Sequence, residues 1–176
     1  MKKLLITGFE AFGGETINPS WCAVEALPCE IGEYSLHKMC LPVVFFEASR
    51  LVIKCAEEIC PDVIICVGQA GGRKAITPEF VAINLRYASI PDNSGNMPQD
   101  IPVVANSDAA YFTTLQVRKI CDAISSVGIP AQVSYSAGTY VCNDLMYTLL
   151  DHFKNSDVKV GFIHIPYCEE QNKEPS

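Results

Sequence analysis

Residues 47–68 read EASRLVIKCAEEICPDVIICVG, and this stretch decides the fold class. Its first half carries apolar residues at i, i+3, i+4, i+7, i+8 and i+11 from Ala48, which is the spacing of one face of a helix. Pro61 ends that helix because proline cannot continue it. Residues 62–68 then form a short apolar run that is typical of a fully buried strand. The stretch therefore predicts a helix that leads directly into a central strand.

The same alternation extends in both directions along the chain. Asn18 and Pro19 are suited to the N-cap and first position of another helix, and Gly128 to the end of a later one. Strands alternating with helices predict an α/β fold with a mainly parallel sheet and helices on both faces. The further strands are expected at 3–9, 34–43, 80–85, 131–136 and 158–166, and the further helices at 19–27, 117–127 and 141–153.

Length, charge and hydropathy restrict the class of protein. The chain has 176 residues, enough for one domain. It carries 13 Lys and Arg against 20 Asp and Glu, and a net charge of −7 argues against nucleic-acid binding. The apolar run near the N-terminus is shorter than the ~7 to 15 residues of a signal peptide core, and no run approaches the ~18 residues of a membrane span. We therefore expect a cytoplasmic domain with no membrane partner.

The chain has nine cysteines, and none forms a CxxC pair. We therefore expect free thiols and no metal site. A cysteine chosen at random is expected to be a small, buried hydrophobic residue. Cys142 differs because it follows the expected strand 131–136 and a short turn, and opens a helix. A helix N-terminus favours a thiolate, and its free N–H groups can hold an oxyanion. This is the arrangement of a nucleophile elbow, although the GxSxG string is absent.

The first loop, Gly8–Glu15, has two glycines at the spacing of a phosphate-binding loop. It has Glu15 where the lysine should be, which excludes a nucleotide loop because an anion repels phosphate. Phe9 and Phe12 come from the same loop. Their aromatic rings suit either the core or the wall of a pocket, and the sequence leaves both open.

Three chain segments bring reactive side chains to the same rim of the predicted sheet. Glu79, Cys142 and His164 each follow the carboxyl end of an expected parallel strand, where such sheets bind ligands. A thiol, an imidazole and a carboxylate are the nucleophile, base and orienting acid of a cysteine hydrolase. Asp92 is an alternative for the carboxylate.

Several long strings then identify a family. TGFEAFGG, NPSW, VGQAGGRKAITPE, INLRYASIPDN, SAGTYVCN and GFIHIP, in this order between residues 7 and 166, resemble the pyrrolidone carboxyl peptidases (pyroglutamyl peptidase I, C15-type cysteine peptidases). The resemblance implies a three-layer α/β/α sandwich of the phosphorylase/hydrolase type. It also implies removal of N-terminal pyroglutamate from peptides without a cofactor, by a homo-oligomer that is a tetramer or a dimer.

The resemblance also implies roles for single residues. It makes Cys142 the nucleophile, His164 the base and Glu79 the residue that orients the imidazole. The substrate-binding residues that it implies are Phe9, Phe12 and Tyr140 as apolar walls, with Gln69 and Val141 as backbone contacts to the lactam.

The chain departs from the family at several points. Phe80 and Ser89 stand where the family usually has arginine, with Arg73 and Arg86 as candidate substitutes. Tyr140 stands where phenylalanine is common. We expect residues 1–176 to form one peptidase domain without the final helix of the family. A homologue that binds pyroglutamyl peptides without efficient cleavage is the alternative function.

Overall fold

Parallel strands form the centre of the fold in the computed structural model, which describes residues 1–171. The main sheet has six strands in the order β2-β3-β1-β4-β8-β5. Strands β3, β1, β4 and β8 run parallel, whereas the edge strands β2 and β5 are antiparallel to their neighbours. The bounds are β1 Lys2–Phe9, β2 Glu30–Ile31, β3 Tyr34–Leu41, β4 Val63–Gln69, β5 Thr77–Pro78 and β8 Lys159–Ile165.

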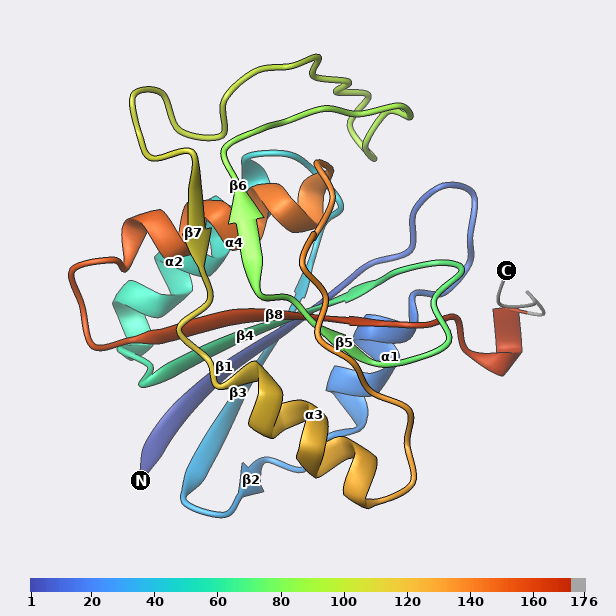
Figure 1. The fold of residues 1–176 in the computed structure, drawn as a ribbon, viewed down its shortest axis with the longest axis vertical. Helices are drawn as coiled ribbons and strands as arrows, with labels where there is room; N and C mark the ends of the chain where they lie inside the picture. The colour runs from blue at the N-terminus through green and yellow to red at the C-terminus, as the bar shows by residue number, and fades with distance from the viewer. Residues whose placement is uncertain (172–176) are drawn as a thin grey trace.

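Helices cover both faces of this sheet, as Figure 1 shows. Helices α2 (Glu47–Ile59) and α4 (Val141–His152) lie together on one face, and α1 (Pro19–Ala26) and α3 (Val117–Ser126) lie on the other. A short 3₁₀ helix, Glu169–Gln171, follows β8. The predicted α/β fold with three layers is confirmed. Within residues 1–171, no helix has the length and apolar character that a membrane crossing requires.

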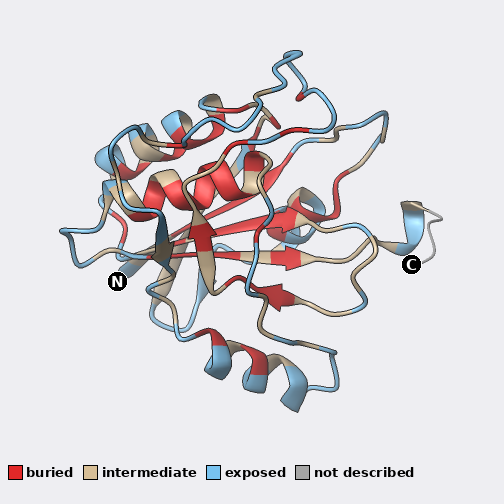
Figure 2. Ribbon diagram, turned by 45° about the horizontal axis from the view of Figure 1, so that its top comes forward, coloured by how far each residue is buried: buried red, intermediate tan, exposed pale blue. Residues whose placement is uncertain are grey.

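Successive side chains of a strand point to opposite faces of the sheet. Helices cover both faces, so the side chains on both sides of the strands are buried. Leu5 and Ile64 join the core beneath α2 and α4, whereas their neighbours Ile6 and Ile65 pack with Val24 of α1. Figure 2 shows the resulting buried layer running through the strands and the inner side of α4. Near-continuous apolar runs such as residues 63–67 therefore belong to strands that pack on both faces.

Helix α1 is joined closely to the end of β1. The Asn18 side chain caps the helix by accepting a hydrogen bond from Ser20 N at 3.0 Å, and Pro19 occupies its first turn, as predicted. Ser20 Oγ in turn accepts a bond from Phe9 N at 2.9 Å. A Cβ on Gly8 would lie 2.7 Å from the Ser20 and Trp21 backbone, so glycine permits this approach.

Two expected strands differ in the structure. Residues 131–136 form no regular strand and instead run beside residues 76–80, with isolated parallel bridges at Ala131 and Ser134. Pro78 has no N–H to donate, which interrupts the ladder. The stretch 80–85 contributes only β6 (Val81–Ile83), which pairs with β7 (Ala110–Phe112) in a separate sheet of two strands.

The expectation of buried cysteines is wrong for much of the set. Only Cys66 and Cys121 are buried, and Cys55, Cys142 and Cys168 are half-buried. The remaining four are exposed, because they lie on outward positions of helices, strands and turns: Cys22, Cys29, Cys40 and Cys60.

Replacing Gly8 with alanine tests the approach of α1 to β1. The new methyl group meets backbone atoms that cannot rotate away, so we expect Gly8→Ala to lower the free energy of unfolding by about 1–3 kcal/mol. Urea unfolding followed by circular dichroism measures this loss. Ser125→Ala on the exposed side of α3 is the control and should stay within about 0.5 kcal/mol. Equal stability of Gly8→Ala and the wild type would contradict the close contact.

Candidate active site

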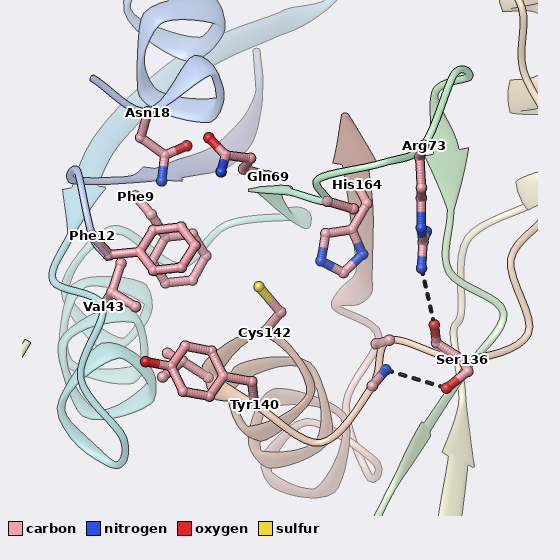
Figure 3. A pocket seen from close by; sticks show the side chains of 14 residues that line it. Phe9, Phe12, Asn18, Val43, Gln69, Arg73, Ser136, Tyr140, Cys142 and His164 are labelled. Atoms are coloured by element: carbon pink, nitrogen blue, oxygen red, sulfur yellow. Dashed lines mark hydrogen bonds between the residues drawn. The ribbon is translucent and has the colours of Figure 1, made fainter. Parts of the chain in front are cut away.

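A cavity of about 290 Å³ opens where β1, β4 and β8 reach their carboxyl ends. This is the rim at which open α/β sheets bind ligands. Figure 3 shows the side chains that point into it. The lining residues are Phe9, Phe12, Asn18, Val43, Gln69, Ala70, Arg73, Ser136, Ala137, Gly138, Tyr140, Val141, Cys142 and His164.

Cys142 lies in the first turn of α4, and the two residues after it anchor that turn. The buried Asn143 side chain accepts a bond from Ile83 N at 2.9 Å and donates to the carbonyl oxygens of Ile83 and Leu85. The buried Asp144 forms an ion pair with Arg86, whose guanidinium lies 3.8 Å from the centre of the Phe46 ring. The helix start that carries Cys142 is thus attached to β6 (Val81–Ile83) and to the segment that follows it.

The sulfur of Cys142 rests against the end of β4. A Cβ on Gly68 would lie 3.0 Å from Cys142 Sγ and 2.7 Å from the Phe162 ring, so only glycine leaves room for both. Gly68 pairs in register with His164 of β8. Cys142 and His164 therefore both point into the cavity, from a helix and from the adjacent strand (Figure 3).

His164 is held by a buried carboxylate. Its Nδ1 lies 2.7 Å from Oε1 of Glu79, and Glu79 is 0 % exposed. A carboxylate accepts the Nδ1 proton, which leaves Nε2 as the nitrogen free to exchange a proton. Glu79 follows β5, which runs antiparallel to β8, so the predicted reason for its position is wrong although its position at the rim is right. The chain reverses after the loop 70–76 and brings Glu79 back beside His164.

Arg73 is the cation of this cluster. Its Nη1 lies 2.7 Å from Glu79 Oε1, and its Nη2 donates to the Ser136 carbonyl oxygen at 3.2 Å. It also bonds to Thr77 Oγ1. Of the two candidate substitutes for the missing arginines, Arg73 lies in the cavity, whereas Arg86 is committed to Asp144.

Burial and charge set the protonation of the three groups. Burial raises the pKa of the Cys142 thiol to about 12, and the Glu79 charge adds to this. Burial lowers the pKa of His164, and the Glu79 carboxylate opposes that change. Burial acts to raise the pKa of Glu79, but bonding to His164 and Arg73 takes it below its ordinary value. At Cys142, desolvation by burial therefore opposes the effect of the helix N-terminus, which favours a thiolate.

Aromatic rings close the end of the cavity opposite Arg73. The Tyr140 ring lies 6.4 Å from that of Phe12 and 5.2 Å from that of Phe45. Its hydroxyl donates to the Pro91 carbonyl oxygen at 3.0 Å. Phe9 and Phe12 both line the cavity, and both also pack with the core, so the two alternatives hold together.

Three further residues were expected at the site: Gln69, Val141 and Asp92. Gln69 and Val141 line the cavity, and Gln69 Oε1 accepts a bond from Gln171 at 2.9 Å. Asp92 does not take the carboxylate role beside His164. It accepts bonds from the N–H groups of Phe45, Ser94 and Asn96, and so it holds its own loop.

Several lining residues were not expected from the sequence. Asn18 and Val43 reach the cavity from the start of α1 and from the loop after β3. Ala70 and Ser136 line it from loops that belong to the strings VGQAGGRKAITPE and SAGTYVCN. Asn18, Ala70 and Ser136 lie within strings that resemble the family, and that position is the signal that could have indicated them, whereas Val43 lies outside these strings. Within residues 1–171, no group of His, Cys, Asp and Glu side chains is arranged to hold a metal ion.

The sequence profile of the family described as pyroglutamyl peptidase matches residues 2–175. The chain belongs to this family. A pyrrolidone-carboxylate peptidase of Bacillus amyloliquefaciens is 48 % identical over 178 residues, which cover 99 % of this chain and 83 % of the relative. That of Escherichia fergusonii is 51 % identical over 173 residues, which cover 97 % of this chain and 81 % of the relative.

Solved structures of the family agree with this fold. The crystal structure of the Bacillus amyloliquefaciens pyroglutamyl peptidase I superimposes with a TM-score of 0.95 at 48 % identity, and covers 100 % of this chain and 87 % of that one. A mutant pyrrolidone carboxyl peptidase from Pyrococcus furiosus gives a TM-score of 0.92 at 45 % identity, with 96 % and 83 % covered.

Two substitutions that shift the pKa of His164 in opposite directions test its arrangement with Glu79 and Arg73. Glu79→Gln removes the anion that stabilises the imidazolium, so we expect it to lower the pKa of His164 further. Arg73→Met removes a nearby cation, so we expect it to raise that pKa. NMR titration of the imidazole carbon-bound protons measures both shifts. The chain has three histidines, so His37 and His152 act as internal controls. Shifts in the same direction for both variants would contradict the arrangement.

Proposed function

We propose that this chain is a cysteine peptidase that removes N-terminal pyroglutamate from peptides, as the names of its relatives indicate. The observation that carries the proposal is the position of Cys142. Its sulfur lies between an aromatic end of the cavity and the His164 imidazole, which is hydrogen-bonded to Glu79 (Figure 3). Glu79, Cys142 and His164 are the proposed catalytic residues.

The aromatic end suits the pyrrolidone ring. Phe9, Phe12 and Tyr140 supply apolar walls, and we assign backbone contacts with the lactam to Gln69 and Val141. Pyroglutamate carries no charged amine, so it enters without loss of a hydrated ammonium. An ordinary N-terminus would have to lose that hydration, which is costly. The cavity thereby selects for the cyclised residue.

The reaction follows from the protonation of the cluster. Burial raises the pKa of the Cys142 thiol, which favours its protonated form. His164 Nε2 therefore takes the thiol proton as the sulfur attacks the pyroglutamyl carbonyl. The N–H groups in the first turn of α4 have no partners within the helix and stabilise the oxyanion. His164 then donates the proton to the leaving amine, and water hydrolyses the thioester.

The comparisons do not support the alternative of a homologue that binds without cleaving, because the relatives are named as peptidases. Phe80 and Ser89 stand at positions where the resemblance implies arginine. Arg73 provides a cation at the site in their place, bonded to Glu79 and in the wall of the cavity.

We place this activity in the cytoplasm, in a homo-oligomer. The cysteines support a reducing compartment, because all nine are free thiols. An apolar groove between α1 and the segment after β8 supports an assembly, and Ile17, Ile76, Ile129 and Ile165 line it. We expect pyroglutamyl peptides as substrates.

Loss of the thiol tests the assignment. Cys142→Ala should lower kcat for 7-amino-4-methylcoumarin release from its pyroglutamyl amide by at least about 10⁴-fold, because it removes the nucleophile. Cys29→Ala removes an exposed thiol and should retain wild-type turnover. Circular dichroism of both variants should match that of the wild type, as a control for folding. Undiminished turnover in Cys142→Ala would refute Cys142 as the nucleophile.

A further inference from the structure

The cavity has two chemically different ends, and Cys142 separates them. Phe12, Val43 and Tyr140 lie at one end, whereas Arg73 and Ser136 lie at the other, beyond His164 (Figure 3). Under the proposed function, the pyrrolidone ring occupies the aromatic end and its carbonyl carbon lies at the sulfur. The peptide beyond the scissile bond must then leave past Arg73 and Ser136.

A free backbone edge begins at that point. Residues 130–134 use one side of their backbone to pair with residues 76–80, for example through Ser134 N to the Pro78 carbonyl at 2.9 Å and Phe80 N to the Ser134 carbonyl at 2.7 Å. The alternate residues Val133 and Tyr135 have their N–H and C=O groups on the other side. In the part of the chain that the structure describes, these groups make no hydrogen bond. An unpaired edge of this kind can accept an added strand.

Exposed aromatic rings lie beside this edge. The ring of Phe80 is 5.3 Å from that of Phe112 and 5.7 Å from that of Tyr135. Phe112 is 66 % exposed and Tyr135 is 60 % exposed, and Arg118 donates to the Tyr135 hydroxyl at 3.2 Å. We call Phe80, Phe112 and Tyr135 the aromatic patch. Phe80 belongs to it because its ring lies beside both of the others.

We propose that residues 133–136 and the aromatic patch bind the leaving peptide of the substrate, with that peptide extended as an added strand. The proposal rests on the proposed function and deepens it. The continuity of the chain supports it, because residues 136–138 line the cavity and residues 133–135 continue directly from them. The ligand is a pyroglutamyl peptide with two or more residues after the scissile bond, at least one of them aromatic or large and apolar.

A comparison of two substrates tests this subsite. One is pyroglutamyl-7-amido-4-methylcoumarin, which has no peptide after the scissile bond, and the other is pyroglutamyl-Ala-Phe-Ala-amide. In Tyr135→Ala and Phe112→Ala we expect kcat/KM for the peptide to fall roughly three- to tenfold more than for the coumarin substrate, mainly through KM. N-methylation of the Phe amide in the peptide should weaken turnover by the wild type, because it removes a backbone donor.

Tyr34→Ala is the matched control, since it removes an aromatic ring at the amino end of β3, at the opposite end of the strands. It should change neither substrate. Equal losses for both substrates in Tyr135→Ala would overturn the subsite. So would unchanged peptide turnover together with a smaller assembly by light scattering, because the patch would then be a contact between copies.

Peptide binding in the Cys142→Ala background separates the subsite from the chemistry. Calorimetry should show weaker binding of pyroglutamyl-Ala-Phe-Ala-amide when Tyr135→Ala is added, and equal binding would overturn the subsite. Absence of turnover of the coumarin substrate by the wild type would instead refute the proposed function, and the binding measurement would still decide the subsite.

Discussion

The buried hydrogen bond between Glu79 and His164 is the interaction on which the site depends. A carboxylate with 0 % exposure is costly unless it is paired, and here an imidazole and a guanidinium both lie 2.7 Å from one of its oxygens. This pairing requires the loop 70–76 to bring Arg73 beside Glu79 and β5 to return antiparallel beside β8. The pairing of β5 with β8 therefore positions Glu79 and Arg73, the two charged groups that set the protonation of His164.

A second constraint is steric. Cys142 Sγ fits against the end of β4 only because Gly68 has no Cβ, which would lie 3.0 Å from the sulfur and 2.7 Å from the Phe162 ring. The buried Asn143 and Asp144 hold the helix start at this depth through β6 and Arg86. Burial at this depth also raises the pKa of the thiol, so the same packing that positions the nucleophile makes it depend on His164 for activation.

Local patterns predicted the regular elements well and their pairing less well. The helix over 47–59 and the strand over 63–69 follow from periodicity and Pro61, and the cap at Asn18 follows from its side-chain chemistry. Residues 131–136 have the composition of a strand, yet they form only part of a ladder because Pro78 on the partner segment lacks a donor. The exposure of Cys22 and Cys40 also depends on which faces other elements cover, which no local pattern contains.

The sequence by itself determined the α/β class, the family and the three reactive residue types, because these depend on residue order and local periodicity. Tertiary structure decided how they act. Only the packed chain shows that Glu79 follows an antiparallel strand, that Arg73 rather than Arg86 lies at the site, and that burial raises the pKa of the Cys142 thiol. The physical reason is that desolvation and pairing depend on which groups lie close together in space, and residues far apart in the sequence supply them.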